Sequence, residues 1–500
     1  MLMPKDAVKM SNASHKDKIL YAFNDLTVSK VTFDFVTFIQ LAAFHCKRYG
    51  YTKIHFVFTP GPKNGFRNDD LPPNDADSLR GMLRNLALPA CWLRPECVGV
   101  SYLATREETK FFLAECEDNI FPRDYTVENP VPDYMWPGIN ATLIRGEEMT
   151  PLVAPKEAQI QAAAYCELVS NNRKLITITL RESSYYTERN SQIPEWKKFI
   201  DSIDKSKYAV VIVRDTEKTF SPALFEGIPE CSLASYDIGF RTALYEKSYL
   251  SMFTNNGTLS IACHAFVPYL SFGMKNESHH ASSIGFFKNI LGLSYGDQFY
   301  GFPSSQKLVW EKDNFETIKT EFDKHVLHIE SHPDGQFPMN TFQSETQILD
   351  TCNSVVGYIG NKMSRSSMDE DRDALLKIVE LSKGNNAQAF NLLGVWYANK
   401  SLYEESEKAL HNAIQADTTF KRAYLNLAAI YQNTAKSKEA LRTYFHFIET
   451  VEASIDVLDL AVRCAVAQGN IASAQRLVQK AETINAPPES ILSLRAYLPS

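Results

Sequence analysis

The turn formed by Asn255, Asn256 and Gly257 contains residue types that suit phosphate binding. Asparagine tolerates turn backbone, and glycine lets the backbone approach a ligand closely. A helix that begins near Thr258 would present free amide N–H groups and the positive end of its dipole. These features fit a diphosphate. The alternative is an ordinary strand, turn and helix whose first turn is capped by the chain itself.

Polar side chains follow the two apolar runs that precede this turn. Arg181 and Glu182 end a β-branched run, and Asp215 ends the next one. A guanidinium at the end of a buried strand needs an anion, which could be a phosphate or an internal carboxylate such as Glu182. Arg189 and Asn190 could add donors. Asp215 could accept hydrogen bonds from a ribose or a base, or cap its own turn.

Apolar strand-like runs alternate with helical patterns along most of the chain, which is typical of parallel α/β architecture. The first such region spans about 17–135, and the second follows a helix at 156–169. Between 122 and 155 the prolines are dense enough to break helix and strand, and they predict a connection between two domains. Since ligands bind beyond the carboxyl ends of parallel strands, the polar residues above would lie together.

Helical repeats are predicted at the C-terminus. Three consecutive 34-residue units keep one register, with large or small apolar residues at the positions where a tetratricopeptide repeat (TPR) has them. A helix at 371–383 would precede the units, and a capping helix at 489–497 would follow. The helices could pack against the rest of the chain or bind a partner. The residues that keep the register are Phe390, Leu393, Gly394, Tyr397, Leu410, Ala413, Tyr424, Leu427, Ala428, Tyr431, Ala440, Tyr444, Phe447, Leu458, Ala461, Val462, Ala465, Ala474, Val478 and Ala481.

These patterns predict a chain of the α/β class, with two Rossmann-like domains followed by an α-helical TPR solenoid. We expect the first domain at 1–150, the second at 151–345, a linker at 346–368 and the repeats at 369–500.

The order of motifs over 174–275 resembles the donor-binding half of GT-B glycosyltransferases, and the heptosyltransferase group most of all. The shared pattern is a strand, an Asn-rich turn with Gly257, a helix with small residues at 262–265, and a strand ending in Phe272 and Gly273. The turn departs from that group because it lacks an acidic residue. The combination with TPR units also resembles the architecture of several bacterial glycosyltransferases.

The resemblance implies that a nucleotide-diphosphate sugar binds between the two α/β halves. Arg181 and the helix start at Thr258 would then stabilise the departing diphosphate without a metal, and no other cofactor is implied. A carboxylate must deprotonate the acceptor hydroxyl. Asp25, at the end of the first apolar run, is the candidate base, although it could instead cap the helix near Phe33.

The composition excludes several other classes of protein. A formal charge of −7 argues against nucleic-acid binding over the whole chain. The nine scattered cysteines contain no CxxC pair, so neither a disulfide framework nor a zinc site is indicated. No signal peptide or membrane-spanning stretch is evident, so we expect a cytoplasmic protein. The glycine-rich signatures of ordinary dinucleotide and ATP sites are absent.

The sequence thus predicts a glycosyltransferase that moves a sugar from a nucleotide-diphosphate donor to a hydroxyl acceptor. The acceptor could be a polysaccharide, a lipid-linked glycan or a protein, and the repeats would recruit it or a partner protein. The alternatives are an adaptor built on a degenerate GT-B body and another nucleotide-dependent α/β enzyme. The sugar, and the retention or inversion of its configuration, stay open.

Overall fold

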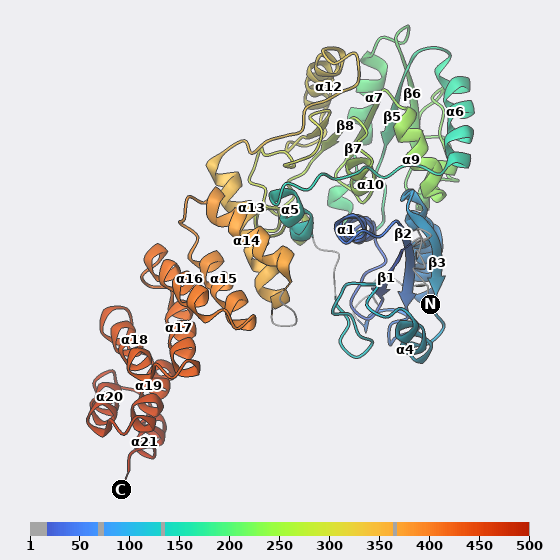
Figure 1. The fold of residues 1–500 in the computed structure, drawn as a ribbon. Helices are drawn as coiled ribbons and strands as arrows, with labels where there is room; N and C mark the ends of the chain where they lie inside the picture. The colour runs from blue at the N-terminus through green and yellow to red at the C-terminus, as the bar shows by residue number, and fades with distance from the viewer. Residues whose placement is uncertain (1–17, 69–74, 132–135, 364–367, 500) are drawn as a thin grey trace, which may run out of the picture. The chain divides into compact units, whose positions relative to one another are not determined.

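The computed structural model describes residues 18–68, 75–131, 136–363 and 368–499. The chain forms two compact units. Unit 1 takes residues up to 139, 147–287 and 295–341, whereas unit 2 takes 140–146, 288–294 and 342–500. Both Rossmann-like halves belong to unit 1, and the helical repeats belong to unit 2 (Figure 1).

The first half of unit 1 is a four-stranded parallel sheet in the order β3-β2-β1-β4. Its strands are β1 (Ile19–Asp25), β2 (Lys53–Thr59), β3 (Cys97–Tyr102) and β4 (Ile120–Phe121). Helix α1 (Phe35–Arg48) packs on one face, where the ring of Phe38 meets those of Phe56 and Phe121. Helix α4 (Arg106–Glu115) packs on the opposite face through Phe112 and Leu113.

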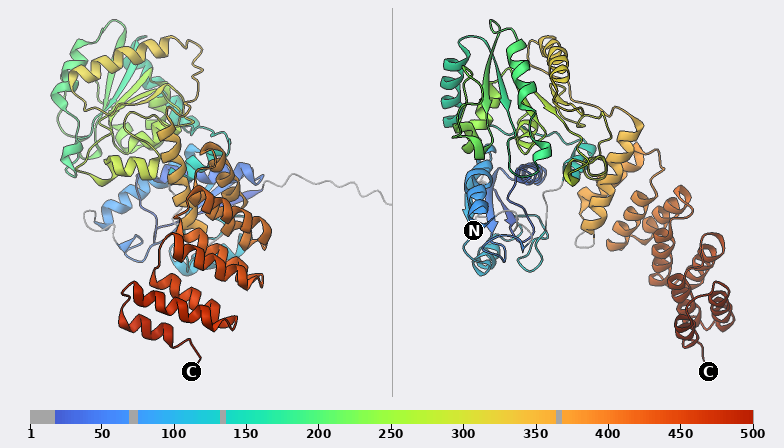
Figure 2. Two further views of the ribbon diagram at one scale, coloured as in Figure 1. Left: turned by 90° about the vertical axis from the view of Figure 1, so that its left-hand side faces the viewer. Right: turned by 180° about the vertical axis from the view of Figure 1, so that it is seen from behind.

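The second half is a five-stranded parallel sheet in the order β6-β5-β7-β8-β9. Its strands are β5 (Lys174–Thr179), β6 (Tyr208–Val213), β7 (Leu250–Thr254), β8 (Tyr269–Phe272) and β9 (Gln306–Leu308). Both faces are covered by helices, which explains why these strands read as continuous apolar runs (Figure 2).

Alternate residues of β5 enter two separate cores. Leu175 packs with α6 (Lys156–Ser170) and α9 (Ile238–Lys247) on one face. Ile176 and Ile178 pack with α7 (Ile193–Ser202) and α12 (Phe315–Glu330) on the other. Helix α10 (Thr258–His264) follows β7 and contacts α1 of the first half. The remaining short helices of unit 1 are α2 (Ala76–Met82), α3 (Leu88–Ala90), α8 (Leu233–Tyr236) and α11 (Ile284–Phe286).

Unit 2 consists of paired helices in the predicted register. The first helices of the three pairs begin at Ala387, Lys421 and Ile455, so each pair starts 34 residues after the previous one. The pairs are α15 (Ala387–Asn399) with α16 (Tyr403–Ala416), α17 (Lys421–Asn433) with α18 (Ser437–Thr450), and α19 (Ile455–Ala467) with α20 (Ile471–Thr483). Helices α14 (Asp369–Leu381) and α21 (Pro488–Arg495) flank them. The predicted fold class is therefore confirmed.

Two segments differ from the sequence-based expectation. Helix α13 (Glu345–Met363) occupies the stretch where we expected a linker, and it buries Cys352, Val355, Val356 and Ile359 in the core of unit 2. Helix α5 (Trp136–Ile144) forms within the proline-rich stretch that we expected to break helices. Proline is compatible with the first turn of a helix, and no further proline interrupts the chain before Pro151.

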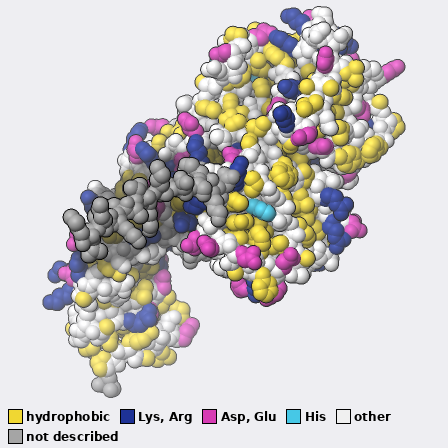
Figure 3. Space-filling model, turned by 45° about the vertical axis from the view of Figure 1, so that its right-hand side comes forward, with side chains coloured by type: hydrophobic (Ala, Val, Ile, Leu, Met, Phe, Trp, Pro, Cys, Tyr) yellow, Lys and Arg dark blue, Asp and Glu magenta, His cyan; other side chains and the backbone are white. Residues whose placement is uncertain are grey.

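Charged side chains of both signs are interspersed on the face of the molecule that Figure 3 presents, with apolar side chains gathered in patches among them. No helix within the described ranges is long and apolar enough to span a membrane.

Candidate functional site

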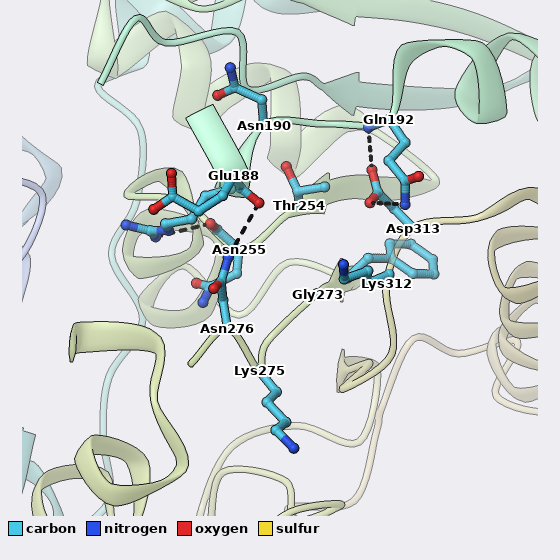
Figure 4. Close-up of a pocket in the computed structure, with 12 residues that line it drawn as sticks. Glu188, Asn190, Gln192, Thr254, Asn255, Gly273, Lys275, Asn276, Lys312 and Asp313 are labelled. Atoms are coloured by element: carbon cyan, nitrogen blue, oxygen red, sulfur yellow. Dashed lines mark hydrogen bonds between the residues drawn. The ribbon is translucent and has the colours of Figure 1, made fainter. Parts of the chain in front are cut away.

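A pocket of about 250 Å³ opens at the carboxyl edge of the second sheet. The loop after β5 forms one side, the ends of β7 and β8 form the floor, and the stretch after β9 forms the other side (Figure 4). This is the place where parallel sheets bind ligands. The lining residues are Glu188, Arg189, Asn190, Gln192, Thr254, Asn255, Phe272, Gly273, Lys275, Asn276, Lys312 and Asp313.

Cationic side chains line this pocket. Arg189, Lys275 and Lys312 form no ion pair with any other residue that the structure describes. Among the residues that the structure describes, the Arg189 side chain donates one hydrogen bond, from Nη2 to the carbonyl oxygen of Asn255 at 3.1 Å. Burial lowers the pKa of Arg189, and the neighbouring charge of Arg181 lowers it further. A guanidinium in such surroundings favours a bound anion.

The amide side chains of the pocket hold its walls together. Asn276 Nδ2 donates to the carbonyl oxygen of Glu188 at 3.2 Å, and Asn190 Nδ2 donates to that of Ser183 at 2.9 Å. Figure 4 shows Asn255 and Asn276 next to each other beneath Glu188, whereas the amino group of Lys275 extends away from them. Arg189 is therefore the cation that the loops position best.

On the far side of the pocket, Asp313 has a structural role. Its Oδ2 accepts hydrogen bonds from the backbone N–H of Gln192 and from Trp196 Nε1, both at 2.8 Å. These bonds tie the start of α7 to the stretch after β9.

Arg181 braces the loop after β5. We expected this residue to face an anion, but its guanidinium donates to the carbonyl oxygens of Tyr185 and Tyr186 and to Asn190 Oδ1. Burial lowers the pKa of Arg181, and the nearby carboxylate of Asp215 counteracts that effect. Arg181 thus fixes the loop that carries Arg189, and it does not line the pocket itself.

Glu182 and Asp215 also have internal partners. Glu182 forms a bidentate pair with Arg214, with oxygen–nitrogen distances of 2.7 and 2.8 Å. Asp215 Oδ2 accepts a hydrogen bond from the backbone N–H of Glu182 at 3.0 Å. These contacts join the loops after β5 and β6. Glu182 is therefore part of an internal ion pair. Its partner is Arg214, and not Arg181 as the sequence alternative suggested.

The start of α10 is partly occupied by the chain itself. Asn256 Oδ1 accepts hydrogen bonds from the backbone N–H of Thr258 at 2.9 Å and from its hydroxyl at 2.6 Å. A Cβ atom at Gly257 would lie 2.3 Å from the ring of Phe33, so glycine is required here for a close approach to α1 and its preceding loop. Of the predicted turn, Asn255 lines the pocket, whereas the side chain of Asn256 bonds to Thr258, the first residue of the helix.

Asp25, the predicted base, is enclosed at the end of β1. Its Oδ1 accepts hydrogen bonds from Arg106 Nη1 at 2.9 Å and from the backbone N–H of Thr27 at 2.8 Å. Its Oδ2 accepts from Arg106 Nη2 at 3.0 Å and from the Tyr125 hydroxyl at 2.9 Å. The side chain is fully buried, so these donors leave no path for an acceptor hydroxyl. Asp25 organises this end of the first sheet.

Asp34 is a carboxylate that we did not predict as functional. It lies just before α1, and its side chain makes no capping hydrogen bond to the helix. The residue reaches solvent, yet protein atoms surround it closely enough for burial to raise the pKa of the Asp34 carboxyl. The Thr32 hydroxyl, which donates to Asp34 at 3.2 Å, and the charges of Lys30 and Arg189 counteract this rise.

The neighbours of Asp34 place it where the two halves of unit 1 meet. Phe33, the preceding residue, contacts Gly257 of the second half, and Arg189 is close enough to influence the titration of Asp34. In the sequence, an acidic residue before an apolar helix indicates an N-cap. Asp34 does occupy the N-cap position of α1, but its side chain makes no capping hydrogen bond, and only the tertiary structure shows its neighbours in the second half.

No group of three or more His, Cys, Asp or Glu side chains in the described ranges is arranged to hold a metal ion.

Comparisons with known proteins found similarity at the level of solved structures. No family model matches the chain, and no curated protein matches it. A glycosyl transferase family 9 structure from Veillonella parvula is 10% identical with a TM-score of 0.37, over 64% of this chain and 97% of that one.

Helical repeat proteins are also among the similar structures. The TPR protein YrrB, described as having an unusual peptide-binding site, is 16% identical with a TM-score of 0.24, over 36% of this chain and 89% of that one. MamA is 18% identical with a TM-score of 0.23, over 34% and 91%. Likenesses at this level do not identify a substrate or an activity.

Proposed function

We propose that the protein is a glycosyltransferase that transfers a sugar from a nucleotide-diphosphate donor to a hydroxyl acceptor. The observation that carries the proposal is the guanidinium of Arg189, which forms no ion pair with a described residue, in a pocket at the carboxyl edge of a parallel sheet. A diphosphate would pair with the guanidinium of Arg189, and Lys312 would add a second cation.

In the proposed reaction, the acceptor oxygen attacks the anomeric carbon of the sugar while the bond from that carbon to the diphosphate oxygen breaks. Asp34 would accept the proton of the acceptor hydroxyl. Its raised pKa suits this role because a more basic carboxylate takes a proton more readily. Arg189 would stabilise the negative charge that develops on the departing diphosphate.

The positions of these two residues fit one active site. Asp34 belongs to the first half of unit 1 and Arg189 to the second, and each influences the titration of the other. Asp25 is not proposed as the base, because Arg106 and Tyr125 already occupy its oxygens. The helical repeats of unit 2 would recruit the acceptor or a partner protein.

Titration calorimetry with UDP, GDP, ADP and CDP tests the donor site. At least one diphosphate should bind, and Arg189→Ala should weaken that binding by about 1.5–3 kcal/mol, which is roughly 10- to 150-fold. The matched control is Arg80→Ala, which removes a half-exposed arginine already paired with Asp77. Its affinity should equal that of the unmodified protein.

Two results would contradict the proposal. If Arg189→Ala and Arg80→Ala bound the diphosphate equally well, the pocket would not be the donor site. If folded protein bound none of the four diphosphates and transferred no sugar, the adaptor alternative would stand in its place.

A further inference from the structure

The outer face of helix α6 carries two large apolar side chains that the described part of unit 1 does not cover. Its inner residues Ala158, Ala162 and Cys166 pack against α9 and the second sheet. On the outer side, Ile160 is 64% exposed and Leu168 is 79% exposed. The helix lies at the edge of unit 1 in Figure 1 and in the view from behind in Figure 2. Such large exposed side chains on one helix face indicate an interaction surface.

The residues of this face are arranged symmetrically about Ala164. Ile160 and Leu168 lie four residues before and after it, which places all three on one stripe of the helix. Gln161 and Glu167 lie three residues to either side. A pattern that reads alike in both directions is self-complementary when two copies pack antiparallel, as a two-fold interface requires.

We propose that the partner of this face is a second copy of the chain, with α6 packed antiparallel on α6 and the two-fold axis at Ala164. Ile160 of each copy then covers Leu168 of the other. The small side chain of Ala164 lets the two helices approach closely at the axis. Gln161 of each copy comes opposite Glu167 of the other and can donate a hydrogen bond to its carboxylate.

The charges at the helix ends support the antiparallel arrangement. Glu157 in the first turn and Arg173 just beyond the last turn form no ion pair with another described residue. In the antiparallel pair, Glu157 of one copy lies near Arg173 of the other. The two helix dipoles also oppose each other, whereas a parallel pair would bring like ends together.

The area of the interface limits its strength. A stable interface buries about 800 Å² per partner, and one pair of four-turn helices buries less than that. We therefore expect a reversible dimer. Sedimentation velocity of the full chain should show a monomer at about 1 µM and a growing dimer fraction towards about 100 µM, the range of weak protein–protein affinities.

A matched pair of variants locates the interface. Leu168→Glu should abolish the dimer up to about 100 µM, because the charge would be buried against Ile160 of the other copy. Leu327→Glu is the control, since Leu327 is also an exposed helical leucine, at 69%, but lies on α12. Both variants leave the core intact, and the control should dimerise like the unmodified protein.

Cysteine cross-linking tests the position of the axis. All nine native cysteines are buried, so an introduced surface cysteine is the accessible thiol. Ala164→Cys should form a disulfide-linked dimer on oxidation with copper phenanthroline, because residue 164 faces its own copy across the axis. Glu157→Cys should not, since its two copies would lie about 21 Å apart along the helices.

Three outcomes would overturn the proposal: a monomer at every concentration, a dimer that persists in Leu168→Glu, and cross-linking at position 157 in preference to 164. The proposal would be established if Leu168→Glu lost the dimer, Leu327→Glu kept it, and the cysteine at position 164 formed the cross-link.

Discussion

Two arginines of the same loop differ in what their side chains can do. Arg181 donates hydrogen bonds to carbonyl groups of its own loop, whereas Arg189 donates only one hydrogen bond to the described residues and lines the pocket. The sequence identifies both as candidate anion-binding residues. It cannot separate them, because the difference depends on which backbone carbonyl groups the folded loop turns towards each guanidinium.

The two acidic residues Asp25 and Asp34 likewise cannot be separated from the sequence alone. Judged from the sequence, Asp25 is the better candidate for the catalytic base because it follows a strand directly. In the structure its two oxygens accept four hydrogen bonds. Asp34 has the position of an ordinary helix cap, yet the charge of Arg189 in the other half is close enough to counteract the rise in its pKa. Local patterns do not reveal whether the lone pairs of a carboxylate are occupied.

Asp34→Asn should lower the rate of sugar transfer by about 10²- to 10⁴-fold while the diphosphate still binds, since general-base catalysis contributes about that much. In the unmodified protein the rate should fall as the pH drops through the raised pKa of Asp34, because the protonated carboxyl cannot take a proton. That acidic limb should disappear from the residual rate of the variant. Measured pH–rate profiles of both proteins check this.

The stability of the same variant gives an independent readout. A carboxyl whose pKa is raised by folding stabilises the protein below its unfolded pKa, and that contribution is lost as the pH rises through the folded pKa. At neutral pH, Asp34→Asn should therefore melt no lower than the unmodified protein. The control Asp323→Asn removes an exposed carboxylate on α12 and should leave the rate unchanged. A normal rate in Asp34→Asn would exclude Asp34 as the base.

At the scale of elements, the periodic patterns predicted most strands and helices of both units. Strands β5 and β6 appear where the β-branched and apolar runs place them, and the repeat helices begin 34 residues apart. The linker prediction over 346–368 differs from the structure because α13 gains its order from packing against α14 and α15. A helix that is stabilised mainly by tertiary packing is only weakly indicated by its own local sequence.

Gly394 tests the packing within the first repeat pair. A Cβ atom there would lie 2.6 Å from Leu410 Cγ, and Leu410 is fully buried. Gly394→Ala should therefore destabilise the contact between α15 and α16 by about 1–3 kcal/mol, as overpacking does. Amide hydrogen exchange of these two helices in the full chain measures the effect as faster exchange.

Gly357 is the matched control for this substitution. It also lies in a helix of unit 2, but a Cβ atom there would meet nothing within 4 Å. Gly357→Ala should slow exchange or leave it unchanged, because alanine favours a helix over glycine by about 0.5–1 kcal/mol. Equal effects of the two substitutions would mean that the small residue at Gly394 is not a packing requirement.

On the scale of the whole molecule, unit 2 is assembled from three separate segments of the chain. Residues 288–294 bind α13 through hydrogen bonds that include those from Thr351 Oγ1 to the carbonyl oxygen of Gly292 at 3.0 Å and from Ser354 Oγ to that of Ile290 at 2.7 Å. Ser294 Oγ also donates to Asp350 Oδ2 at 2.8 Å. Ala141 and Ile144 of a second segment join the same core. The repeats are therefore not a simple C-terminal addition to the chain.

Two fragments test the role of α13 in unit 2. Fragment 342–500 keeps α13, whereas fragment 369–500 removes it and exposes the side chains of α14 and α15 that pack against it. Each large apolar side chain contributes about 1.5–3 kcal/mol when buried. Fragment 369–500 should therefore melt at least about 10 °C lower, since 1 kcal/mol shifts the melting temperature of such a domain by roughly 4 °C.

Two variants of fragment 342–500 control for the change in length. Val355→Ser, which places a hydroxyl in the core, should lower the melting temperature, whereas Leu349→Ser on the exposed side of the same helix should not. Equal melting temperatures of the two fragments would mean that residues 346–363 act as the linker that the sequence suggests.

Hydrophobic periodicity and the 34-residue register determined the fold class of this protein, because each depends only on which side chains one strand or helix must bury. The tertiary structure alone decided which polar residues are available for chemistry. Arg189 and Asp34 come from different halves of unit 1, and their surroundings depend on contacts between segments more than a hundred residues apart. No local pattern encodes those contacts.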